Sequence, residues 1–132
     1  MEQANSAPGS AGRPVRLLVV DADPAATSSL EEWLAAHPEV ELERRWSARE
    51  TLSAMPCEHY DLCLIDEDGG DVDGVTLGAM ILQMNPGSRV VLMTGRVTSP
   101  LRQRALEHGF RGVLAKPVVP AVLSMLVEPM RA

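Results

Sequence analysis

The sequence predicts a single α/β domain built around a parallel β-sheet. Four short apolar runs lack the alternation of half-exposed strands, which indicates strands covered by helices on both faces. Helix-length segments separate these runs, and the connections are only a few residues long. The chain has 132 residues, of which 45% are hydrophobic, so it can close one core but is too short for two ordinary domains.

The predicted strands differ in how completely they are covered. Four buried strands are expected at residues 17–20, 62–65, 90–93 and 113–115. A fifth strand is expected at residues 40–44, where Val40 and Leu42 alternate with Glu41 and Glu43. Alternation with charged residues is typical of a strand at the edge of a sheet.

Five helices are expected between and after these strands. Asp23-Pro24 offers a capping carboxylate followed by proline at the first helical position, and this helix should end near His37-Pro38. Ser47, with Glu50 three residues later, has the form of a capping box and predicts a second helix that runs to about Met55. Further helices are expected over residues 74–84 and 99–108 and from Pro120 onward.

The composition excludes several classes of function. Eighteen acidic residues against twelve basic ones give a formal charge of −6, which argues against direct nucleic-acid binding. The longest uncharged stretch, residues 74–88, is shorter than the roughly 20 apolar residues of a membrane span. Residues 1–14 lack a secretory signal pattern, so we expect a disordered leader and a cytoplasmic protein. Cys57 and Cys63 are too few for a zinc cluster and should be reduced.

Four polar residues, of different kinds, directly follow the four predicted buried strands. They are Asp21, Asp66, Thr94 and Lys116. Because the carboxyl ends of parallel strands lie at one edge of the sheet, two carboxylates, a hydroxyl and an ammonium should converge there. Taken singly, each has a simpler explanation as a helix cap, a turn residue or a solvated charge. Lys116 is the only lysine, however, and its compact ammonium suits contact with a phosphoryl or carboxylate oxygen.

The acidic segment 66–74 raises the question of cation binding. As a calcium loop it fails, because Gly70 stands where a ligand is needed, Asp71 where glycine is needed and Leu77 where glutamate is needed. Several carboxylates still crowd around one strand end. Their mutual repulsion favours a divalent cation with hard oxygen ligands, either Mg²⁺ or Mn²⁺.

Several motifs in order along the chain are similar to those of the receiver domain of bacterial two-component response regulators. The matching positions are Asp21, the run 60–66 that ends in Asp66, Asp73-Gly74, Thr94-Gly95 and Lys116-Pro117. The resemblance covers about residues 15–131. It implies a receiver domain over residues 15–132 with a flavodoxin-like (βα)5 fold, a doubly wound parallel sheet with strand order 2-1-3-4-5.

The resemblance also implies roles for individual residues. Asp66 would accept a phosphoryl group from a sensor histidine kinase or a phosphotransfer protein. Mg²⁺ would be held by Asp21, Asp66 and the backbone carbonyl of Asp68, while Lys116 would pair with the phosphoryl oxygens. Thr94 would then move and switch a surface of the fourth and fifth helices and the last strand. That surface would bind a downstream effector protein, and a homodimer through the same helices is a further expectation.

The chain departs from the family pattern in ways that keep other functions open. Ala22 replaces a second acidic metal ligand, which puts Mg²⁺ affinity in doubt, and Val113 replaces an aromatic switch residue. The loop after Asp66 is acidic instead of apolar. One alternative is therefore a pseudo-receiver, a protein-interaction module that works without phosphorylation. A haloacid-dehalogenase-like phosphatase is disfavoured because no aspartate follows Asp73, so we expect no enzymatic activity.

Overall fold

The computed structural model describes residues 13–23, 30–55, 58–68 and 70–131. The five strands are β2 (Val15–Val20), β3 (Val40–Arg45), β4 (Leu62–Asp66), β5 (Arg89–Thr94) and β6 (Gly112–Ala115). The helices are α1 (Leu30–Ala35), α2 (Ala48–Ala54), α3 (Gly74–Met84), α4 (Ser99–Glu107) and α5 (Pro120–Val127), followed by the short 3-10 helix η3 (Glu128–Arg131). Residues 1–12 of the predicted leader, and Cys57, lie outside the described residues.

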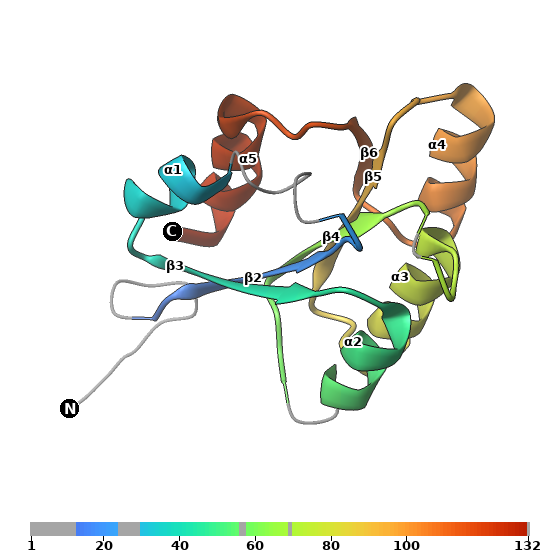
Figure 1. Ribbon diagram of the computed structural model, residues 1–132, viewed down its shortest axis with the longest axis horizontal. Coiled ribbons are helices and arrows are strands. Elements are labelled where there is room, and N and C mark those ends of the chain that lie inside the picture. The colour runs from blue at the N-terminus through green and yellow to red at the C-terminus, as the bar shows by residue number, and fades with distance from the viewer. Residues whose placement is uncertain (1–12, 24–29, 56–57, 69, 132) are drawn as a thin grey trace.

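The strands form one parallel sheet in the order β3-β2-β4-β5-β6 (Figure 1). In chain order this is 2-1-3-4-5, which confirms the predicted topology. Each step from one strand to the next along the chain passes through a helix, as parallel neighbours require. None of the helices in the described parts of the chain is long and apolar enough to cross a lipid bilayer.

Helices cover both faces of the sheet and create two hydrophobic cores. Helices α1 and α5 lie on one face, and α2, α3 and α4 lie on the other (Figure 1). On β2, Leu17 and Val19 belong to the α1/α5 core, whereas Leu18 and Val20 belong to the other core. Every residue of the central strand β4 is buried. A continuous apolar run is therefore required there, because neighbouring side chains point into opposite cores.

The two outer strands are less covered than the inner ones. On β3 only Val40 is buried, as expected for the predicted edge strand. Strand β6 was predicted to be covered on both faces, and this is wrong, since its residues are half-buried or exposed. The physical reason is its position, because β6 pairs with β5 alone and forms the other edge of the sheet.

The helix caps follow the sequence with one shift. The Ser47 side chain accepts a hydrogen bond from the backbone N–H of Glu50 at 3.1 Å, as the capping box predicts. The reciprocal bond reaches one residue further back, because the Glu50 carboxylate accepts from the N–H of Trp46 at 2.9 Å. The predicted helix start at Pro24 lies outside the described residues, and the described helix α1 begins at Leu30.

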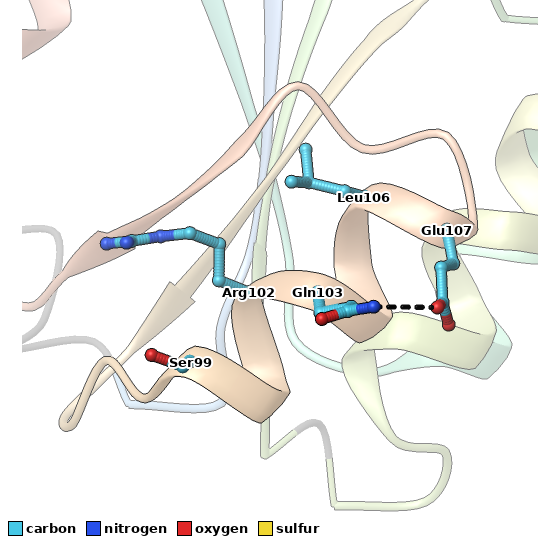
Figure 2. A pocket seen from close by; sticks show the side chains of 5 residues that line it. All are labelled: Ser99, Arg102, Gln103, Leu106 and Glu107. Carbon is cyan, nitrogen blue, oxygen red and sulfur yellow. Dashed lines mark hydrogen bonds between the residues drawn. The ribbon is translucent and has the colours of Figure 1, made fainter.

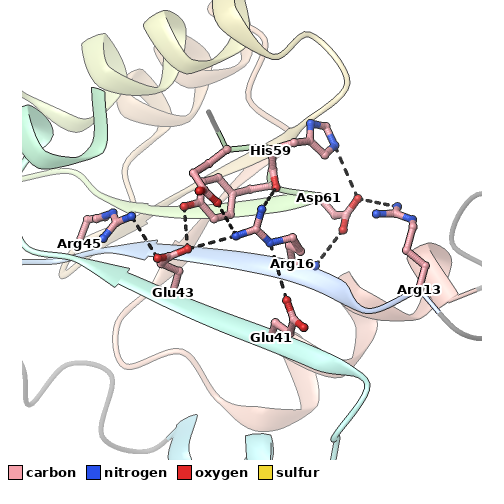
Figure 3. Close-up of polar contacts among 9 residues, drawn as sticks. Arg13, Arg16, Glu41, Glu43, Arg45, His59 and Asp61 are labelled. Atoms are coloured by element: carbon pink, nitrogen blue, oxygen red, sulfur yellow. Dashed lines mark hydrogen bonds and ion pairs between the residues drawn. The ribbon is translucent and has the colours of Figure 1, made fainter. Parts of the chain in front are cut away.

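A polar cluster ties β2 to β3 and to the chain before β4 (Figure 3). The guanidinium of Arg16 contacts Glu58 at 2.7 Å and Glu43 at 3.2 Å, and it lies over the ring of Tyr60. The Asp61 carboxylate accepts a hydrogen bond from the backbone N–H of Arg16 at 2.8 Å. The hydrogen bond to Glu58 is the main reason why the pKa of Arg16 is raised. This cluster helps to hold the strands in register near the amino-terminal end of β2.

Candidate functional site

The four polar residues that follow the strong strands meet at one edge of the sheet. Asp66 and Thr94 are the last residues of β4 and β5, and Asp21 and Lys116 follow β2 and β6 directly. The strand registers place them close together in a staggered row, since Asp66 pairs with Met93, the residue before Thr94, and Thr94 pairs with Ala115, the residue before Lys116. Asp21, Asp66 and Thr94 are all buried. The edge therefore presents buried polar groups where a parallel sheet places its ligands.

Lys116 connects the two carboxylates of this edge. Its Nζ lies 3.1 Å from Oδ2 of Asp66 and 3.4 Å from Oδ2 of Asp21. The side chains are 24%, 9% and 1% exposed, respectively. The other oxygen of each carboxylate holds a loop, because Oδ1 of Asp66 accepts from the N–H of Asp68 at 3.2 Å and Oδ1 of Asp21 from that of Asp23 at 2.9 Å. Both carboxylates are thus fixed at both oxygens.

The charges at this edge shift the ionisation of Asp66 and Lys116. Burial raises the pKa of Asp66, and the neighbouring Asp21 carboxylate raises it further, while the hydrogen bond from Lys116 opposes the rise. For Lys116, burial opposes the charged form, but the hydrogen bond and the charge of Asp66 together with Asp21 outweigh it and raise the pKa. An ammonium is therefore stabilised beside a carboxylate that is costly to keep ionised.

Thr94 is held by a residue that the sequence did not single out. Its hydroxyl donates to Oε1 of Glu67 at 2.6 Å and accepts from the N–H of Arg96 at 3.1 Å. Glu67 reaches this position because its own N–H continues the sheet ladder to the carbonyl of Met93 at 2.8 Å. The only signal in the sequence is that Glu67 follows Asp66 directly, and this does not reveal the partner.

The loop after β4 is anchored at several points. The Asp71 carboxylate accepts hydrogen bonds from the N–H groups of Ala48 and Arg49 at 3.1 Å each, which caps α2 and lowers the pKa of Asp71. The Asp71 carboxylate is thereby directed to the start of α2. At Gly74, a Cβ atom would collide with the carbonyl oxygen of Asp66, so the loop can return to the strand end only with glycine there.

The two carboxylates at this edge fit part of a magnesium site. Mg²⁺ keeps several waters in proteins and is commonly bound through one or two carboxylates, which Asp21 and Asp66 provide. No group of three His, Cys, Asp or Glu side chains suited to sharing a metal ion exists in the described parts of the chain. Ala22 is exposed next to Asp21 and offers only a methyl group. The backbone carbonyl of Asp68 stays a predicted ligand.

Val113 and Cys63 both pack among hydrophobic residues, as expected from their side chains. Val113, at the position of the family's aromatic switch residue, is half-buried on β6 and packs against the core of α2, α3 and α4. Cys63 lies fully buried in β4, and burial raises the pKa of its thiol to about 12. A thiol in that state is unreactive, so Cys63 serves as a core residue.

Comparison with known proteins gives consistent matches. The family model of the response regulator receiver domain matches residues 17–128. The transcriptional regulatory protein ComA of Bacillus subtilis is 28% identical over 111 residues, and GlrR of Escherichia coli is 30% identical over 106 residues. These alignments cover 76% and 80% of this chain. The chain spans about half the length of ComA and about a quarter of GlrR, with 49% and 24% of those proteins covered.

Solved structures agree with this match. A CheY-like receiver domain protein from Methanospirillum hungatei has a TM-score of 0.78 and 27% sequence identity. The superposition covers 89% of this chain and 94% of that protein.

Proposed function

The chain belongs to the response regulator receiver domain family, and from this membership we propose that Asp66 accepts a phosphoryl group from a sensor histidine kinase or a phosphotransfer protein. Receiver domains of response regulators are signalling domains and generally bind Mg²⁺ at the phosphorylation site. The observation that carries the proposal is the contact of the Lys116 ammonium with Asp66 and Asp21 at 3.1 and 3.4 Å. A positive charge beside the largely buried carboxylate of Asp66 supports this role, because it can neutralise charge on an incoming phosphoryl group.

The chemistry follows from the charges. A carboxylate attacks a dianionic phosphoryl group poorly unless negative charge is neutralised as the group is transferred. Lys116 supplies one positive charge, and its three hydrogens can pair with phosphoryl oxygens as they approach Asp66. A bound Mg²⁺, held by Asp21, Asp66 and the Asp68 carbonyl, would neutralise further charge on the phosphoryl oxygens. The donor's leaving group departs with the electron pair of the broken bond, and an acyl phosphate forms on Asp66.

Transfer to Asp66 is coupled to a surface through Thr94. The hydroxyl of Thr94 is the group at the end of β5 that can turn toward a phosphoryl group on β4, and β5 leads directly into α4. The outer face of α4 carries an open hollow lined by Ser99, Arg102, Gln103, Leu106 and Glu107 (Figure 2). Leu106 is 52% exposed there. We place the effector surface on α4, β6 and α5, and a homodimer would use the same surface.

A pseudo-receiver remains the second candidate function. It is favoured by Ala22, because the acidic edge supplies two carboxylate ligands where the family pattern supplies three. In that case the α4 surface would bind its partner without phosphorylation of Asp66.

Intact-mass measurement with a small phosphodonor tests the proposal. The wild-type protein with acetyl phosphate and Mg²⁺ should gain one phosphoryl mass, and Asp66→Asn should not. Glu107→Gln, which neutralises an exposed carboxylate on α4, is the matched control and should be labelled like the wild type. Labelling of Asp66→Asn would show that another residue is the acceptor. Absence of labelling in wild type and control would favour the pseudo-receiver.

A further inference from the structure

The hydroxyl of Thr94 has fixed partners on both sides. It accepts one hydrogen bond, from the N–H of Arg96 at 3.1 Å. It donates to Oε1 of Glu67 at 2.6 Å, a length typical of a bond between a hydroxyl and an ionised carboxylate. The carbonyl of Arg96 lies at 3.2 Å and is the weaker acceptor, because the bond is longer and uncharged. Glu67 therefore holds the hydroxyl hydrogen.

A threonine hydroxyl has a single hydrogen to donate. A hydrogen bond from Thr94 to Glu67 and one from Thr94 to a phosphoryl oxygen therefore exclude each other. The side chain of Thr94 can turn to a phosphoryl group on Asp66 only after the contact with Glu67 breaks. This exclusion depends on the number of hydrogens alone and needs no assumption about the size of the conformational change.

The backbone keeps Glu67 in place to hold this contact. Its N–H donates to the carbonyl of Met93 at 2.8 Å, and its carbonyl accepts from the N–H of Gly74 at 2.9 Å. Both bonds fix the residue between the end of β5 and the start of α3. The carboxylate is thus presented to Thr94 from an ordered backbone, so the bond has to restrict only the side-chain torsions of Glu67.

We propose that Glu67 is a positioning residue that competes with the phosphoryl group for the hydroxyl hydrogen of Thr94 and so sets how strongly phosphorylation switches the domain. This inference rests on the proposed function of Asp66. Phosphorylation must move the hydrogen bond donated by Thr94 from the Glu67 carboxylate to the phosphoryl group. Removing the Glu67 carboxylate destabilises the state in which Thr94 is turned away from the phosphoryl group. The equilibrium then shifts toward the switched state by the free energy of the lost hydrogen bond.

Beryllofluoride, a phosphoryl mimic, gives an equilibrium measurement of this competition. Three variants separate the hydrogen bond from the charge. Glu67→Ala removes both, Glu67→Asp keeps the charge but is one methylene too short to hold the bond, and Glu67→Gln keeps an acceptor oxygen without charge. We expect Glu67→Ala and Glu67→Asp to bind beryllofluoride, at fixed Mg²⁺, about 10-fold more tightly than wild type, as loss of a bond to a charged acceptor implies. Glu67→Gln should lie between them and wild type.

The Thr94→Val background is the matched control, since valine keeps the shape but has no hydroxyl. There, Glu67→Asp should leave beryllofluoride affinity unchanged. Wild-type affinity of Glu67→Asp in the Thr94 protein would overturn the proposal, because it would show that losing the hydrogen bond to Thr94 does not change beryllofluoride binding. An equal gain for Glu67→Asp in the valine background would overturn it as well.

The side-chain rotamer of Thr94, measured by NMR couplings without any phosphodonor, tests the contact itself. One rotamer is expected in the wild type and averaging in Glu67→Ala, whereas averaging in the wild type would overturn the inference. If beryllofluoride does not bind the wild type, the proposed function fails, and this rotamer alone decides whether Glu67 holds Thr94.

Discussion

Replacing Lys116 by methionine should destabilise the folded protein through the two carboxylates that it leaves behind. Methionine keeps much of the length and apolar volume of the side chain but removes the ammonium. Asp66 and Asp21 are buried, so they would face each other without the cation that lies 3.1 and 3.4 Å from their oxygens. Like charges at a buried site disfavour ionisation of both groups.

The distances give the size of the effect. At an effective dielectric constant of about 20, opposite charges at these separations attract by about 5 kcal/mol per pair. The cost of taking three charged groups out of water offsets most of that attraction. Breaking a buried ion pair by removing one partner costs about 3–5 kcal/mol. Since a quarter of the Lys116 side chain is exposed, we expect the unfolding free energy to fall by about 2–3 kcal/mol.

Urea unfolding at pH 7 in the presence of a chelator measures this difference. Asp66→Asn should recover about 1 kcal/mol or more in the Lys116→Met background, because it removes one of the two unpaired charges. In the wild-type background Lys116 offsets part of the charge of Asp66, so the gain there should be smaller by about 2 kcal/mol, which is the coupling expected from the double-mutant cycle. A coupling within about 0.5 kcal/mol of zero would refute the reasoning, since it would mean that solvent already screens these charges.

Four other outcomes follow from the structure. Ala22→Asp should tighten Mg²⁺ binding in a titration followed by Trp fluorescence, and it should be less stable than wild type in chelator because it adds a third carboxylate. Lys116→Arg should slow labelling by acetyl phosphate although it keeps the charge, because a planar guanidinium does not reproduce the contacts of an ammonium; labelling at the wild-type rate would contradict this. Gly74→Ala should lower the unfolding free energy by about 1–3 kcal/mol, seen as a lower Tm, because its Cβ collides with the strand end. Asp73→Ala should remove the α3 cap and cost about 1 kcal/mol at pH 7. Burial opposes ionisation of Asp73, but hydrogen bonds from Thr76 and the helix N–H groups lower its pKa. The stability it contributes is therefore present above the unfolded pKa of about 4 and is lost as the pH falls through the lower folded value, so wild type and variant should converge in acid unfolding curves.

The placement of the site could be predicted because it depends on strand ends alone. Once the runs that end at Asp21, Asp66, Thr94 and Lys116 are recognised as parallel strands, their carboxyl ends must share one edge. No side-chain detail is needed for that step. The contact of Lys116 with Asp66 then follows, because the ammonium and the carboxylate are the groups at that edge with opposite charge.

Other features could not be predicted because they depend on neighbours in space. The apolar run 113–115 has the composition of a covered strand, and only the strand order makes β6 an edge. In the same way, nothing in the letters around Glu67 indicates Thr94, which is 27 residues away along the chain. Asp71 and α2 are likewise joined by the path of a loop, and a loop path is set by the elements that it connects.

The contacts of the acidic loop reduce the repulsion between carboxylates that the sequence suggests for this edge of the sheet. From the sequence, crowded carboxylates after β4 imply strong repulsion that a divalent cation would relieve. In the structure three of the loop carboxylates have separate partners, because Glu67 holds Thr94, Asp71 caps α2 and Asp73 caps α3, while Asp68 is exposed to solvent. The repulsion left at the strand edge is that between Asp21 and Asp66, and Lys116 already contacts both. The folded state therefore needs a divalent cation less than the count of acidic residues suggests. The requirement for Mg²⁺ should then appear mainly when a phosphoryl group adds its own negative charge to this edge.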